Sequence, residues 1–192
     1  MADASKVFLI FGRNNDARSA MEQFLRALRL DPIDFDQISS ELGGTPFIGD
    51  IVRRGMEVAQ GIIALFTPDE FAALREEYRY SHDSASDKRR WQARPNVIFE
   101  AGMAFGMAPD RTILVTVGSE VALFSDVAGI HVLRLSNSAE SRARLRTKLI
   151  GIRCSVDQAS TAWLAPDRSG DFERCLPAPL EVGARDPFPG AA

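Results

Sequence analysis

The run Lys6–Phe11, which Gly12 ends, limits most strongly how this chain can fold. A continuous stretch of β-branched, aromatic and leucine side chains is typical of a strand buried on both faces, as in the middle of a parallel sheet. Apolar residues then recur at helical spacing, which predicts an amphipathic helix packed on that sheet: Ala17, Met21, Phe24, Leu25 and Leu28.

Further strands and helices alternate along the chain. Apolar runs predict strands over residues 61–66, 112–117 and 131–135 and a weaker one over 32–35, while helical periodicity is found over 47–60, 95–106 and 138–152. Strands that alternate with helices are joined by right-handed crossovers, so they form a parallel sheet covered on both faces. The sequence therefore predicts an α/β fold with about five parallel strands.

The length of 192 residues and the apolar content of 45% are sufficient for one domain with a short appendage. We expect this domain over residues 1–153 and a C-terminal extension over 154–192, partly packed and ending in a flexible tail rich in Pro and Gly. The charged and polar segment 71–93 is expected to be a long mobile excursion. The loop 39–47, with its paired glycines and proline, is expected to connect the strand at 32–35 to the next helix.

Composition makes several functional classes improbable. A net charge of −3 does not favour nucleic-acid binding, and a row of basic residues is interpreted as the solvated face of an amphipathic helix: Arg142, Arg144, Arg146, Lys148 and Arg153. Two cysteines and two histidines provide neither a disulfide framework nor a metal site, which indicates a reducing, cytoplasmic compartment and no metal. No apolar run approaches the ~20 residues that span a bilayer, so no membrane partner is expected.

Glu100 is the residue on which we expect chemistry to depend, because it lies in the apolar segment 95–106. Burial of an ionised carboxylate costs several kcal/mol unless it is paired. Asn96 lies four residues earlier, on the same face of a helix that Pro95 suits as a first residue. A lone carboxylate could stabilise an oxocarbenium-like ribose when a neutral pyridine leaves, since such a leaving group needs no proton donor. The alternative is that Glu100 caps its own helix.

Three other segments contain candidate binding residues. Gly12, Arg13 and Asn14 precede a helix, where free amides and an arginine could hold a phosphate, although the same residues could form a plain turn with an asparagine cap. The loop that includes Thr45 and Phe47 could offer an aromatic ring to a base or to a neighbouring subunit, or could be a simple connection. Trp91 could stack on nicotinamide or adenine, or could be a packing residue.

Five segments, in this order and spacing, resemble the bacterial TIR-like proteins once described as predicted nucleotide-binding. They are Phe11–Asn14, Gly44–Asp50, Leu65–Asp69, Ala93–Gly102 and Phe124–Gly129. The block Asn96–Glu100 is the most specific of them, and the similarity extends from about Lys6 to Phe172. This family includes TIR effectors of anti-phage systems that signal through cyclic nucleotides or oligonucleotides, and TIR domains fused to bacterial STING.

The resemblance implies a flavodoxin-like TIR fold and, for catalytic members, an NAD glycohydrolase whose essential glutamate is Glu100. NAD is then the substrate, and no cofactor is implied. Arg13 and the loop around Phe47 correspond to nucleotide-facing positions. An adjacent subunit usually completes the pocket, so self-association is expected, with a separate sensor or cyclic-nucleotide-responsive partner as the trigger. Two alternatives stay open: a TIR scaffold without chemistry, and a nucleoside deoxyribosyltransferase-like enzyme that uses a lone glutamate as nucleophile.

Overall fold

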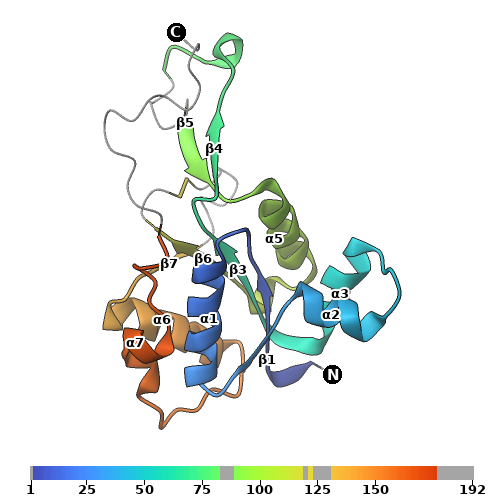
Figure 1. The fold of residues 1–192 in the computed structure, drawn as a ribbon, viewed down its shortest axis with the longest axis vertical. Helices are drawn as coiled ribbons and strands as arrows, with labels where there is room; N and C mark the ends of the chain where they lie inside the picture. Colours follow the sequence, from blue (N-terminus) through green and yellow to red (C-terminus); the bar gives the residue numbers. More distant parts are fainter. Residues whose placement is uncertain (1, 83–88, 119–120, 123–130, 177–192) are drawn as a thin grey trace.

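The computed structural model describes residues 2–82, 89–118, 121–122 and 131–176 (Figure 1). Its central sheet has five strands, all parallel, in the order β2-β1-β3-β6-β7. Their bounds are Asp3–Ile10 for β1, Asp31–Ile33 for β2, Ala59–Phe66 for β3, Thr112–Val117 for β6 and Leu133–Leu135 for β7. The predicted α/β fold with about five parallel strands is confirmed. The segment 124–129 and the tail after residue 176 lie outside the described residues.

Helices cover both faces of this sheet (Figure 1). One face carries α1 (Asn15–Ala27), α6 (Ala139–Gly151) and α7 (Pro166–Ser169), and the other carries α2 (Phe35–Leu42), α3 (Ile48–Val58) and α5 (Pro95–Met107). Each face has its own apolar core, because strand side chains alternate: Val7 and Leu9 face α1, while Phe8 and Ile10 face α3. The described residues also form three short 3₁₀ turns: η1 (Glu76–Tyr78), η2 (Pro109–Arg111) and η4 (Ala162–Leu164).

Helix α2 was not predicted, because residues 39–42 were assigned to a loop. A capping box starts the helix: Asp34 accepts a hydrogen bond from the Gln37 amide at 3.0 Å, and the Gln37 side chain accepts one from the Asp34 amide at 2.9 Å. Gly43 and Gly44, with φ of 69° and 63°, end it. The connection predicted over residues 39–47 is therefore shorter, and it joins α2 to α3.

The segment predicted as a long mobile excursion contains an antiparallel ribbon instead. Strands β4 (Glu70–Ala73) and β5 (Arg89–Gln92) pair with each other and project beyond the end of the central sheet (Figure 1). The rings of Phe71 and Trp91 meet edge to face, with centroids 5.1 Å apart, which gives the ribbon an apolar contact of its own. Residues 83–88 lie outside the described residues. None of the helices in the described part of the chain has both the length and the apolar character needed to cross a bilayer.

The C-terminal residues 154–176 pack into the core on the α1 face, where Trp163 and Phe172 are buried. Arg142 holds this C-terminal segment in place, although the sequence predicted that its side chain would lie on a solvated face. Its side chain is 0% exposed and donates to the carbonyl of Trp163 at 2.9 Å, to the hydroxyl of Ser169 at 3.0 Å and to the carbonyl of Gly170. The interpretation of the basic row was therefore wrong for Arg142, because an acceptor-rich segment from elsewhere in the chain covers it.

Gly170→Ala is expected to destabilise the protein by more than about 1 kcal/mol. Gly170 has a φ of 87°, and an added Cβ would lie 2.0 Å from the backbone oxygen of Ala20, where neither partner can yield cheaply. Gly151→Ala is the matched control, since a Cβ there meets open space and the residue lies within α6. Urea unfolding of both variants measures the difference. A Gly170→Ala protein as stable as the control would contradict this packing.

Candidate functional site

Glu100 lies in the second turn of α5, next to the buried line of the helix. Pro95 occupies the first turn and Arg94 is the N-cap, without a side-chain capping bond. Val97 and Ala101 face the core, whereas Glu100 is half-buried beside them. The alternative that Glu100 caps its own helix is wrong, since it lies beyond the first turn, where the terminal amides are free.

The carboxylate of Glu100 makes no hydrogen bond or ion pair with any residue that the structure describes. Burial raises the pKa of this side chain, because the charged form loses water without gaining a partner. A half-buried, unpaired acid costs stability, and such groups are common at functional sites. Asn96 lies one helical turn earlier and is exposed.

Asn96 and Glu100 lie in the N-terminal half of α5, at the carboxyl end of the sheet. This follows from the right-handed crossover from β3 through α5 to β6, which places α5 antiparallel to the strands with its N-terminus at their carboxyl ends. Ligands bind at this end in open α/β sheets. The β1–α1 loop, which carries Arg13, lies at the same end of the sheet.

The β1–α1 loop is held closed by Asp69, which follows β3. One oxygen of Asp69 accepts a hydrogen bond from the Arg13 amide at 2.9 Å, and the other accepts one from the Thr67 hydroxyl at 2.6 Å. Gly12 permits this approach, since a Cβ there would lie 1.7 Å from an Asp69 oxygen. The backbone amide of Arg13, which was expected to be free, therefore donates its hydrogen bond to Asp69. A phosphate would have to displace this carboxylate to bind the amide.

Asn14 is the N-cap of α1. Its side-chain oxygen accepts from the Ala17 amide at 2.9 Å, and its side-chain nitrogen donates to the carbonyl of Cys175 at 2.9 Å. Both ends of this amide are occupied, as the plain-turn alternative anticipated. The side chain of Arg13 is exposed and has no partner among the described residues. Among the side chains of this loop, the Arg13 guanidinium is therefore the one left to contact a ligand.

A cavity of about 580 Å³ opens beside this loop. Two arginines and two carboxylates give it a mixed charge, and its lining residues are Arg13, Asn14, Asn15, Asp16, Pro68, Asp69, Arg174, Cys175 and Leu176. Glu100 is not among them, because α1 and α5 cover opposite faces of the sheet. Of the two carboxylates of this cavity, Asp69 is already engaged in hydrogen bonds, whereas the carboxylate of Glu100 has no partner among the described residues. One chain does not enclose Arg13 and Glu100 in a single described cavity.

Thr45 and Phe47 lie on the exposed turn between α2 and α3. Phe47 is 76% exposed and the following Ile48 is 62% exposed. Phe99, on the outer face of α5, is 70% exposed. Apolar side chains this open to water, on elements that cover the same face of the sheet, are more typical of an interaction surface than of an isolated monomer. Trp91, by contrast, is half-buried against Phe71, which matches its packing alternative.

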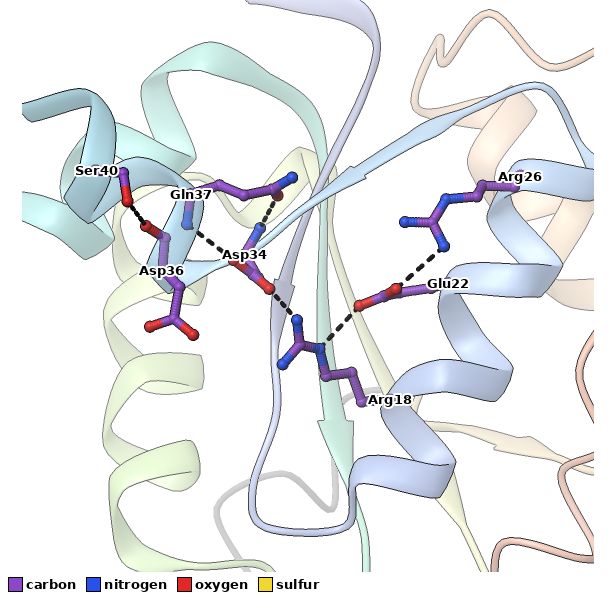
Figure 2. A network of polar contacts seen from close by, with 7 residues as sticks. All are labelled: Arg18, Glu22, Arg26, Asp34, Asp36, Gln37 and Ser40. Carbon is purple, nitrogen blue, oxygen red and sulfur yellow. Dashed lines mark hydrogen bonds and ion pairs between the residues drawn. The ribbon is translucent and has the colours of Figure 1, made fainter.

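Sequence reasoning missed a polar network that joins α1 to α2 (Figure 2). Arg18 pairs with Glu22, with Nε 2.8 Å from Oε1, and also with Asp34, while Glu22 pairs with Arg26 at 3.1 Å. Asp34 followed by Gln37 is a capping-box signature, so the start of α2 was detectable. The approach of Arg18 to Asp34 was not, because it depends on how two helices meet.

The described residues contain no group of three or more side chains that could hold a metal ion. Both cysteines are buried and free, and burial raises the pKa of each thiol to about 11. These thiols are therefore unreactive near neutral pH.

Comparison with known proteins identifies the family. Residues 6–137, more than half of the chain, match the family model described as "CAP12/Pycsar effector protein, TIR domain". The chain is also 25% identical over 159 residues to the uncharacterized protein YuaY of Escherichia coli (strain K12), an alignment that covers 82% of this chain and 49% of YuaY. The chain thus spans about half the length of this relative. Together with the five-stranded parallel sheet, the family match establishes that the chain belongs to the TIR-domain family of CAP12/Pycsar effector proteins.

Proposed function

We propose that this TIR domain is an NAD glycohydrolase that acts through Glu100 when chains associate. The observation that supports the proposal most is the unpaired, half-buried carboxylate of Glu100 near the carboxyl end of the sheet. In this reaction the bond between ribose C1 and the nicotinamide nitrogen breaks, and both electrons leave with nicotinamide. Water then adds to the ribosyl carbon and loses a proton. The anionic Glu100 stabilises the positive charge that develops on the ribose.

The other predicted residues have supporting roles in the proposal. Asn96, one turn from Glu100, orients the carboxylate or binds a ribose hydroxyl, and the free guanidinium of Arg13 contacts a phosphate. Phe47 reaches the site of a neighbouring chain, which would complete a pocket that one chain leaves open. A sensor partner that promotes association would then control NAD depletion in an infected cell.

Nicotinamide release by the purified chain tests the proposal. Released nicotinamide is measured at low protein concentration and under crowding, with the oligomeric state followed by light scattering. Cleavage that appears with association supports the enzyme. Association without any release favours the second candidate, a TIR scaffold without chemistry, which the exposed Phe47, Ile48 and Phe99 also favour.

Phe47→Ser is expected to weaken self-association by about 30-fold or more, since loss of a buried aromatic anchor typically costs about 2 kcal/mol or more at an interface. The side chain is exposed in the single chain, so folding is expected to be unaffected. Leu164→Ser, at an exposed site on the other face of the sheet, is the control. Sedimentation at several concentrations measures association. Equal association by the two variants would exclude Phe47 from the interface.

The raised pKa of Glu100 predicts a pH-dependent stability difference between the wild type and Glu100→Gln. An acid whose pKa is higher in the folded state favours folding most below its unfolded pKa, and this contribution is lost as pH rises through the folded pKa. Relative to the wild type, Glu100→Gln should therefore gain stability between about pH 3.5 and about pH 7.5. Urea unfolding at both pH values measures this. A constant difference would mean that the carboxylate is not desolvated.

A further inference from the structure

Arg18 connects two helices that cover opposite faces of the sheet, α1 and α2. It lies in the first turns of α1, and its guanidinium reaches across to the start of α2 (Figure 2). There it forms an ion pair with Asp34. The same guanidinium lies 4.7 Å from the ring centroid of Phe11, the residue before Gly12 in the β1–α1 loop. One side chain therefore contacts both the loop that carries Arg13 and the helix that leads to Phe47.

Asp34 has two functions at this contact. One oxygen caps α2 through the Gln37 amide, and the other pairs with Arg18. The residue is 6% exposed, so its charge needs both partners. Ile38 is the buried side chain that the described residues of α2 contribute to the core. Phe35 packs partly buried beside it, so these two side chains anchor the helix, and the Arg18–Asp34 pair adds a polar contact that fixes its direction relative to α1.

We propose that Arg18 is a positioning residue that holds α2, and with it the exposed turn at Phe47, in a fixed orientation relative to the β1–α1 loop. It acts through Asp34 and touches no reacting atom. As far as activity is concerned, the inference rests on the proposed function. It adds that assembly competence depends on an ion pair remote from both Glu100 and Phe47.

Three variants separate this role from simple stabilisation. Arg18→Met keeps the apolar stem over Phe11 but removes the charge. Asp34→Asn keeps the cap, because asparagine is as good an N-cap as aspartate, and also loses the pair. Glu22→Gln is the control, since Glu22 binds the same guanidinium at 2.8 Å but belongs to α1 itself.

Hydrogen exchange of backbone amides tests the structural part directly. In Arg18→Met and Asp34→Asn, the amides of residues 35–42 should exchange about tenfold faster, while those of β3, which report global opening, should change far less. Glu22→Gln should resemble the wild type. Unchanged exchange in α2, an equal increase in β3, or the same effect in Glu22→Gln would each overturn the inference, whether or not the protein cleaves NAD.

The effect of Arg18 on assembly is measured by the protein concentration that gives half-maximal nicotinamide release. This concentration should rise about tenfold in Arg18→Met and Asp34→Asn and stay within about twofold of the wild type in Glu22→Gln, with KM for NAD unchanged at saturating protein. An active wild type with an unchanged midpoint in both test variants would overturn the positioning role. A wild type without any release would instead refute the proposed function and leave the exchange result to decide on Arg18.

Discussion

Glu100→Gln is expected to lower nicotinamide release from associated protein by about 10²–10³-fold, the usual cost of losing one electrostatic group aimed at developing charge. The amide keeps the size of the side chain and loses the negative charge that would face the ribosyl cation. Because the wild-type carboxylate is half-buried without a partner, the variant should be at least as stable as the wild type. Activity and stability should therefore change in opposite directions.

Glu140→Gln is the control for this substitution. Glu140 lies in the exposed first turn of α6, on the opposite face of the sheet, where it pairs with Arg144. The same chemical change there should leave NAD cleavage unaltered. Cleavage by Glu100→Gln that matches this control under conditions in which the wild type is active would eliminate Glu100 as the catalytic group.

Arg142→Met is expected to destabilise the protein by about 3 kcal/mol or more, because each buried carbonyl left without a donor costs about 1–3 kcal/mol. The guanidinium satisfies the carbonyls of Trp163 and Gly170, and the rings of Phe24 and Phe172 lie 5.6 and 5.0 Å from it. Methionine fills part of the volume but leaves those carbonyls without a donor. The C-terminal segment should therefore detach from α1 and α6.

Arg144→Met provides the matched control, two residues along the same helix. Arg144 is exposed and pairs with Glu140, so its loss should change stability by less than about 0.5 kcal/mol. Guanidinium unfolding, together with limited proteolysis of residues 154–176, measures both effects. If the two arginine variants unfolded alike and resisted protease alike, the C-terminal segment would not depend on Arg142.

The central sheet could be predicted because its strands are buried on both faces and therefore appear as unbroken apolar runs. Lys6–Phe11 and Gly61–Phe66 were placed within a few residues of β1 and β3. Helix α2 was not predicted because a single fully buried residue, Ile38, gives no apolar periodicity. The ends of this helix depend on a capping box and on two glycines with positive φ. Local hydrogen bonds define this helix more than its apolar face does.

The burial of Arg142 could not be predicted from its neighbours. Within α6 it belongs to a row of basic residues, and its acceptors come from Trp163, Ser169 and Gly170, more than twenty residues later. For the site, the sequence singled out Glu100 as a candidate because it is the one acidic residue in an apolar helix. Arg13 and Glu100 lie beside the two apolar cores on opposite faces of the sheet. This arrangement depends on the order of the strands in the sheet, which the local sequence pattern does not specify.

The most direct measurement is a structure of the associated protein with a non-cleavable NAD analogue bound. The proposal predicts a carboxylate oxygen of Glu100 within about 3–3.5 Å of the ribose carbon that carries nicotinamide, with Phe47 of a neighbouring chain closing the pocket. An analogue bound at a distance from Glu100, or a Glu100 engaged in an ion pair across the interface, would contradict it.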